Sequence, residues 1–205
     1  MNDSIAALVR DMKNGDEGAF DQLYRLYAKK LYGMAFLISK SRADSEDIVQ
    51  EAFVKCFLWR SSIREEKAFE SWLYQILVRT AWRFVKQKRS DFSYEELSDS
   101  SSENYSGSWI QLDKETLEPL EEMISREEKE TLIRAVGNLE LKQRTVVTLY
   151  YFNRLSVKDI ARITGSFEGT VKSRLHKGRE NLKRQLEAYQ EGRRQGNEQT
   201  EGITG

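Results

Sequence analysis

Residues 155–186 constrain the fold of this chain more than any other stretch, because they predict two short helices around a tight turn. Ser156 is placed as an N-cap, and Asp159 follows at the spacing of a capping box. Gly165 stands where a C-cap glycine would end the first helix, and Ser166 is placed to cap the second. This pattern predicts a helix-turn-helix, whose second helix enters the major groove of DNA.

The second helix of this motif has an apolar and a basic side. Its apolar stripe recurs at steps of three and four residues, at Val171, Leu175, Gly178, Leu182 and Leu186. Its other side carries residue types that grip phosphates and read base edges, namely Thr170, Lys172, Ser173, Arg174, His176, Lys177 and Arg179. A plain amphipathic helix with a solvated basic side is the alternative, but the capping and turn residues favour DNA binding.

The composition suits a helical protein of one large or two small domains. The chain has 205 residues, 39% of them hydrophobic and 32% charged, with a single proline. No apolar run approaches the length of about 20 residues that crosses a bilayer, and the N-terminus lacks the pattern of a signal peptide. The single cysteine, Cys56, excludes an internal disulfide and a multi-cysteine zinc site. We therefore expect a cytoplasmic protein.

The charges are unevenly distributed, although 33 basic and 33 acidic residues cancel. Residues 79–89 carry five basic residues and no acid, whereas residues 91–130 carry thirteen acids against three basic residues. The segment around the helix-turn-helix is basic again. Local potential decides what a surface attracts, so two basic surfaces remain available to bind nucleic acid.

The first ninety residues predict four helices. Two lie within residues 1–39 and are separated by a turn at Asn14-Gly15-Asp16. A third begins near Asp44 or Ser45, either of which can cap it, and one of its sides holds Ile48, Ala52, Cys56 and Trp59. Residues 60–68 predict a polar loop. The fourth helix spans about 69–88, and its buried side holds Trp72, Ile76, Leu77, Thr80, Ala81 and Phe84.

Two polar surfaces stand out on these helices. Asp47, Gln50 and Glu51 share one side of the third helix, and the alternative for this patch is an ordinary solvated face near a helix N-terminus, where acids are favoured. The outer side of the fourth helix interleaves basic and aromatic residues, which suits single-stranded nucleic acid because bases stack on rings while cations follow the backbone. Trp82 fits this role and a place in the core equally well.

The remaining segments complete a two-domain, all-α plan. Residues 91–124 lack periodicity and predict a flexible acidic linker. Ser125 and Glu128 form a capping box before another helix, residues 141–152 predict a further helix, and residues 188–205 predict a disordered tail. The domains are therefore expected at residues 1–90 and 125–187.

Four segments in this order resemble the extracytoplasmic-function sigma factors of bacterial RNA polymerase. The resemblance covers about residues 15–90 and 125–187 and is carried by GDEGAFDQLYRLYAKKLYGMAF, DSEDIVQEAFVKCF, FESWLYQILVRTAWRFVKQKR and LKQRTVVTLYYFNRLSVKDIARITGSFEGTVKSRLHKGRENLKRQL. It implies sigma domain 2 at residues 1–90 and sigma domain 4 at residues 125–187. It also implies a function: binding core polymerase, directing it to promoters and promoting DNA melting.

The resemblance assigns residues to three sites. The implied core-polymerase-binding residues are Asp44, Glu46, Asp47, Gln50 and Glu51. Those implied for the minus-ten element, read as melted DNA, are Arg60, Arg64, Lys67, Trp72, Arg79, Trp82, Arg83, Lys86, Lys88 and Arg89. For the duplex minus-thirty-five element, the resemblance adds Ser166 and Glu168 to the seven residues named above. An anti-sigma factor is implied as a further partner.

Some positions depart from the family's pattern. Arg79 and Arg83 stand where many members carry Asn and Asp, and Phe167 replaces a frequent proline. A stand-alone helix-turn-helix regulator with an N-terminal sensing or dimerising module is the alternative function. We do not expect an enzyme, a metal, a cofactor or a small-molecule substrate, because His176 and Cys56 are the only His and Cys and there is no Gly-rich phosphate loop.

Overall fold

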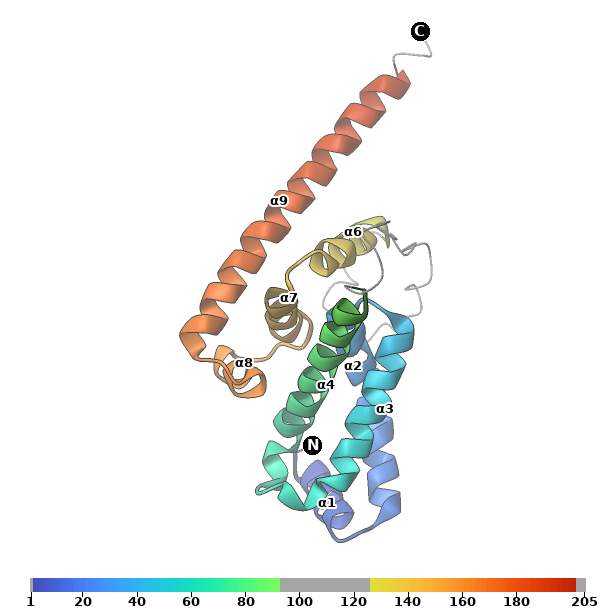
Figure 1. Cartoon of the computed structure of the whole chain (residues 1–205), viewed down its shortest axis with the longest axis vertical. Coiled ribbons are helices and arrows are strands. Elements are labelled where there is room, and N and C mark those ends of the chain that lie inside the picture. The colour runs from blue at the N-terminus through green and yellow to red at the C-terminus, as the bar shows by residue number, and fades with distance from the viewer. Residues whose placement is uncertain (1, 93–125, 202–205) are drawn as a thin grey trace.

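The structure, a computed structural model, describes residues 2–92 and 126–201, and within them every regular element is a helix (Figure 1). The N-terminal half consists of α1 (Asn2–Lys13), α2 (Glu17–Ser39), α3 (Arg42–Leu58) and α4 (Phe69–Phe92). Gly15, at φ 96°, forms the turn between α1 and α2, a conformation that favours glycine. Asp16 caps α2 by accepting hydrogen bonds from the amides of Gly18 and Ala19. The predicted break is confirmed.

Helix α3 begins earlier than predicted. Its N-cap is Ser41, whose Oγ accepts a hydrogen bond from the Asp44 amide at 3.3 Å. The capping roles predicted for Asp44 or Ser45 are therefore wrong, because left-handed Lys40 ends α2 and the next helix starts at once. Trp59, which the sequence places on one side of this helix with Ile48, Ala52 and Cys56, is 49% exposed, since it lies just beyond the last turn of α3.

The connection over residues 60–68 is more ordered than a polar loop. It contains two 3₁₀ turns, η1 (Arg60–Ser62) and η2 (Glu66–Ala68), with buried Ile63 between them. The Lys13 ammonium donates hydrogen bonds to the Ile63 carbonyl at 2.9 Å and to Glu66 at 3.0 Å. The connection is thereby held against α1.

The C-terminal half contains α6 (Arg126–Gly137), α7 (Leu141–Val147), the π-helical turn η4 (Thr148–Phe152), α8 (Val157–Thr164) and α9 (Glu168–Glu201). The helix predicted over residues 141–152 thus changes to a π-helical turn after Val147. The helix-turn-helix is confirmed at α8 and α9. Ser156 accepts a hydrogen bond from the Asp159 amide and donates one to its carboxylate, and Gly165 ends α8 at φ 61°.

Helix α9 continues to Glu201, so the disorder predicted from residue 188 is wrong as far as that residue. The segment has no proline and is rich in helix-forming Glu, Gln and Arg. It also contacts α6, because the Tyr189 hydroxyl donates a hydrogen bond to Glu127 at 2.8 Å. Figure 1 shows α9 extending well past the other helices. The acidic linker beyond residue 92 and Ser125, the cap of the predicted capping box, lie outside the described residues.

The two halves pack against each other around one continuous apolar core. Helix α4 lies against α8 (Figure 1), and Leu73 and Leu77 of α4 belong to the same buried cluster as Ile160 and Ile163 of α8. A second small cluster joins Phe36 and Leu37 of α2 to Ile133 of α6. The face of α4 that adjoins the helix-turn-helix is therefore an interface within the chain.

Gly178 sets how closely α9 approaches α7. It is buried on the apolar stripe predicted for this helix. A Cβ atom placed there would lie 2.8 Å from Cγ2 of Val147, nearer than such atoms normally approach. The missing side chain thus allows the two helices to pack closely.

Candidate nucleic-acid and polymerase interfaces

The outer side of α3 carries the residues implied in polymerase binding, but they divide into two groups. Glu46, Asp47 and Gln50 are exposed, so they are accessible to a partner. Asp44 is only 8% exposed, and the Glu51 side chain is 30% exposed. Burial thus separates residues that can contact a partner from residues that hold the helix in place.

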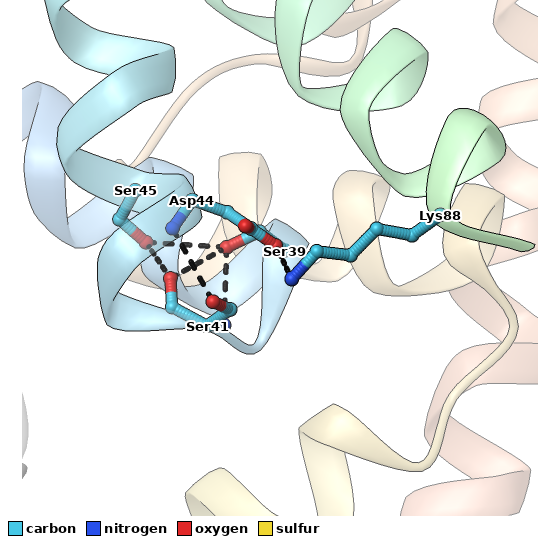
Figure 2. Close-up of polar contacts among 5 residues, drawn as sticks. All are labelled: Ser39, Ser41, Asp44, Ser45 and Lys88. Atoms are coloured by element: carbon cyan, nitrogen blue, oxygen red, sulfur yellow. Dashed lines mark hydrogen bonds and ion pairs between the residues drawn. The ribbon is translucent and has the colours of Figure 1, made fainter. Parts of the chain in front are cut away.

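Asp44 belongs to a polar cluster at the turn between α2 and α3. Figure 2 shows Ser39, Ser41 and Ser45 gathered beside it, with Lys88 reaching across from α4. The Lys88 ammonium lies 2.8 Å from the Asp44 carboxylate, and the hydroxyls of Ser39 and Ser45 are 3.1 Å apart. The Asp44–Lys88 pair joins a residue implied in polymerase binding to one implied in minus-ten binding.

Glu51 makes a second connection between the same two helices. Its carboxylate forms ion pairs with Lys55 one turn further along α3 and with Arg83 of α4. Burial alone would raise its pKa, but hydrogen bonds from Lys55 and Arg83 outweigh burial and lower the pKa below its ordinary value. Glu51 is therefore charged at neutral pH and fixes α4 against α3.

The basic residues of the 60–68 connection differ in accessibility. Arg60 is partly buried, because its guanidinium lies over the Phe57 ring and donates a hydrogen bond to the Phe57 carbonyl at 2.7 Å. Arg64 and Lys67 are exposed. Arg64 and Lys67 are thus the accessible cations of this connection.

The basic side of α4 is exposed along most of its length. Arg79, Arg83, Lys86 and Lys88 are all exposed, and Arg89 belongs to the helix but its side chain lies outside the described part. Trp72 is partly buried and packs near the Phe69 ring, with ring centroids 6.2 Å apart. This packing agrees with the core position predicted for Trp72 rather than with an accessible base-binding ring.

Trp82 is engaged by the C-terminal half. Its indole Nε1 donates a hydrogen bond to Thr145 Oγ1 at 2.9 Å, and the Lys142 ammonium lies over its ring. Gln75, almost two turns earlier on α4, donates a hydrogen bond to the Arg162 carbonyl of α8 at 3.2 Å. The sequence allows Trp82 a place in the core and a base-stacking role equally well, and in this arrangement the side chain is partly buried.

Lys142, which lies over the Trp82 ring, is close to cations of two other helices. Burial, reinforced by the nearby charges of Arg174 and Lys86, lowers the pKa of Lys142 from 10.5 to about 8, and Glu140 only partly opposes this. Lys142 lies on α7, Arg174 on α9 and Lys86 on α4. The basic surfaces of the two halves therefore meet at this point and repel each other.

The recognition helix α9 presents most of the predicted DNA-reading residues to solvent. Thr170, Arg174 and Ser166 are partly buried, and the exposed members are Glu168, Lys172, Ser173, His176, Lys177 and Arg179. His176 lies 3.4 Å from Glu180 one turn further on. The capping role predicted for Ser166 is replaced by another contact, because its hydroxyl accepts a hydrogen bond from Arg174 at 2.9 Å and α9 begins at Glu168.

Arg144 is a buried residue that the sequence interpretation missed. It is 3% exposed and donates hydrogen bonds to the Ile38 carbonyl from Nε at 3.0 Å and from Nη2 at 2.6 Å. Its Nη1 donates to the carbonyls of Gly137 and Leu139. The signal was available in the sequence, because Arg144 shares the inward side of its helix with Leu141 and Thr148.

Other kinds of site find little support among the described residues. No group of three or more His, Cys, Asp and Glu side chains is placed to hold a metal ion there. Within residues 2–92 and 126–201, no helix has the length and apolar character needed to span a bilayer. Cys56 is buried as predicted, and burial raises the pKa of its thiol to about 12.

Comparison with known proteins identifies both halves. The family model described as Sigma-70 region 2 matches residues 23–90, and the one described as Sigma-70, region 4 matches residues 129–182. The first match covers most of the segment that a stand-alone regulator would use for sensing or dimerising, so that alternative is not favoured.

Curated relatives match along nearly their whole length. The ECF RNA polymerase sigma-E factor of Haemophilus influenzae is 34% identical over 181 residues, which cover 88% of this chain and 94% of the relative. The ECF RNA polymerase sigma factor SigW of Bacillus subtilis is 30% identical over 182 residues, which cover 89% and 96%.

Solved structures share the fold. CnrH in complex with the cytosolic domain of CnrY superposes with a TM-score of 0.61 at 19% identity, covering 90% of this chain and 97% of that one. The sigma factor RpoE in complex with the anti-sigma factor NepR from Bartonella quintana gives a TM-score of 0.61 at 20% identity, covering 82% and 96%. The two sigma-70 regions and the curated relatives show that the chain belongs to the extracytoplasmic-function sigma factors of the sigma-70 family.

Proposed function

We propose that this sigma factor binds core RNA polymerase through α3, the minus-ten element through α4 and the minus-thirty-five element through α9. The observation that carries the proposal is the accessibility of three surfaces of suitable charge. Glu46, Asp47 and Gln50 are exposed on α3, whereas the exposed sides of α4 and α9 are basic. Basic surfaces attract the phosphate backbone, and an acidic helix suits a basic partner.

On α3, Asp44 and Glu51 act as positioning residues. Both carboxylates are already engaged by cations of α4, Asp44 by Lys88 and Glu51 by Arg83. Glu46, Asp47 and Gln50 remain as the side chains that contact polymerase. The two ion pairs keep the minus-ten helix at a fixed angle to the polymerase-binding helix.

On α4, the exposed cations hold the DNA backbone while Trp82 stacks on an unpaired base. Stacking on an aromatic ring contributes about 1–3 kcal/mol per base, which helps to offset the cost of melting. Trp82 can do this only after it leaves Thr145 and Lys142. We therefore infer that α4 separates from α7 when the protein assembles with core polymerase, before the promoter DNA is melted.

On α9, the exposed Lys172, Ser173, His176 and Lys177 face the major groove of the duplex. Arg174 is tied to Ser166 and positions the start of the helix. The protein performs no chemistry of its own in this role, and it acts in the cytoplasm, where the bacterial polymerase and promoters are. An anti-sigma factor is a further proposed partner, supported by the anti-sigma complex of the RpoE neighbour.

Transcription in vitro tests this proposal. Purified protein mixed with core polymerase is expected to start transcription at discrete sites on genomic DNA fragments that core polymerase alone does not use. The same protein carrying Lys172→Ala and Lys177→Ala should start at the same sites less often. If the protein forms no complex with core polymerase and yields no new start sites, the proposal fails.

A further inference from the structure

Phe167 is the most exposed large hydrophobic side chain in the described part of the chain, at 86%. A single exposed apolar residue is ordinary on a protein surface. Its position is not ordinary, because it directly precedes Glu168, the first residue of the recognition helix. An aromatic ring therefore lies at the N-terminal end of α9, the helix that is proposed to enter the major groove.

The backbone around Phe167 is fixed. Its carbonyl accepts the hydrogen bond from the Val171 amide at 3.1 Å, and the preceding Ser166 amide donates to the Ala161 carbonyl of α8 at 2.9 Å. The Ser166 hydroxyl is in turn held by Arg174. The ring is thus carried by an ordered turn that is tied to both helices of the motif.

In helix-turn-helix proteins, residues at the N-terminal end of the recognition helix contact base edges in the major groove. Apart from hydrogen-bonding groups, that groove presents one apolar feature, the 5-methyl group of thymine, and Phe is among the side chains that contact it. A phenyl ring makes no hydrogen bond to a base edge. The chemistry that Phe167 can recognise in the groove is therefore a thymine methyl group.

We propose that Phe167 determines specificity by contacting a thymine methyl group within the minus-thirty-five element. The inference rests on the function proposed above, in which α9 reads that element. The neighbouring polar side chains of α9 hold the helix on phosphates and base edges. Phe167 adds discrimination between thymine and any base that lacks the methyl group.

Replacing thymine by uracil tests this contact, because uracil differs only in lacking the methyl group. The full chain bound to core polymerase would first select sequences from a promoter library randomised across the minus-thirty-five region. Each thymine of the best sequence, on either strand, would then be replaced singly by uracil. One of these replacements is expected to weaken binding of the wild-type protein about fourfold, which corresponds to the free energy of burying one methyl group. The same replacement should not change binding of the Phe167→Ala variant.

Leu26→Ala is the matched control, because Leu26 is 58% exposed on α2 and has no proposed contact with DNA. This variant should keep the full uracil effect. Circular dichroism should show both variants folded, since neither side chain is buried. The inference is overturned if no uracil weakens binding, or if the same uracil weakens binding equally in Phe167→Ala. If the polymerase complex selects no sequence at all, the proposed function fails and the inference with it.

Discussion

The indole Nε1 of Trp82 donates a hydrogen bond to Thr145 Oγ1 at 2.9 Å, and this contact joins the basic helix α4 to α7. Thr145 is fully buried and donates its own hydroxyl hydrogen to the Leu141 carbonyl at 2.7 Å. The acceptor is therefore held in one orientation. The Trp82 ring, which is proposed to stack on melted DNA, is thus engaged by the half of the chain that is proposed to bind duplex DNA.

Thr145→Val removes the acceptor while keeping the shape of the side chain. A hydrogen bond of this kind contributes about 1 kcal/mol, so the arrangement in which Trp82 is held should become about fivefold less favoured. If polymerase binds the separated arrangement, the apparent affinity for core polymerase should rise by up to that factor. Titration of labelled full-length protein with core polymerase measures it.

Thr131→Val is the control for that experiment, because it makes the same change at a buried threonine of α6. It should leave the affinity unchanged. Trp82→Phe, which deletes the donor, should act in the same direction as Thr145→Val. An affinity that stays the same or falls in both Thr145→Val and Trp82→Phe would contradict separation of α4 from α7 on binding.

Lys142 should make stability depend on pH. The pKa of its ammonium group is about 8 in the folded chain, against an ordinary value of 10.5 that applies to the unfolded chain. Between these two pH values the unfolded chain therefore binds more protons at this site than the folded chain does. Stability contributed by this site therefore rises with pH between about 8 and 10.5, and below pH 8 the charged group opposes folding by a constant amount. The charges that face it are Arg174 on α9, Lys86 on α4 and Glu140 before α7.

The measurement is the free energy of unfolding of the wild type and of Lys142→Met at several pH values from 7.5 to about 10. The difference between the two proteins should move in favour of the wild type as the pH rises. Because other lysines and tyrosines titrate in both proteins, only this difference is informative. A difference that is flat, or that moves in favour of the variant, would contradict the assigned pKa.

Arg144→Met should destabilise the fold strongly. The change leaves the carbonyls of Ile38, Gly137 and Leu139 without a charged donor in a buried place. Hydrogen bonds to charged groups contribute about 1.5–3 kcal/mol, so a loss of at least about 2 kcal/mol is expected in urea unfolding. Arg134→Met, at an exposed position of α6, should cost less than about 0.5 kcal/mol. Equal effects of the two changes would show that Arg144 does not anchor α7 to α2.

Asp47 and Asp44 should respond differently to substitution. Asp47→Asn removes an exposed charge and should weaken binding to core polymerase, with more effect on the association rate at low salt. Asp44→Asn breaks the pair with Lys88 and should mainly lower stability, by about 1 kcal/mol. Binding kinetics and urea unfolding of both variants distinguish the roles. If Asp44→Asn lost polymerase binding at unchanged stability while Asp47→Asn kept it, the assignment of polymerase contact to Asp47 and of positioning to Asp44 would be contradicted.

Most helices could be predicted from the sequence, because capping and periodicity are local signals. Ser156, Asp159 and Gly165 make the contacts expected of them, since each involves residues only a few positions apart. The errors lie where two local signals compete. Ser41 was overlooked as the cap of α3 because Asp44 and Ser45 are equally good capping residues, and only the left-handed turn at Lys40 decides between them.

The contacts between the two halves could not be predicted in this way. Trp82 meets Thr145 across 63 positions of sequence, and Arg144 meets Ile38 across 106. Periodicity shows which side of a helix is apolar, but it does not show which other helix will cover it. The same reason explains why Asp44 and Glu51 were grouped with Asp47, since their partners Lys88 and Arg83 lie on another helix.

Photo-crosslinking within a transcribing complex of the full chain, core polymerase and promoter DNA tests whether α4 and α9 both contact the promoter. A photoreactive amino acid would replace Arg79 on α4 in one protein and Lys172 on α9 in another, both at exposed positions. Position 79 is expected to crosslink to the melted minus-ten region, and position 172 to the duplex minus-thirty-five region. A complex that starts transcription while neither position crosslinks to DNA would contradict promoter binding by α4 and α9.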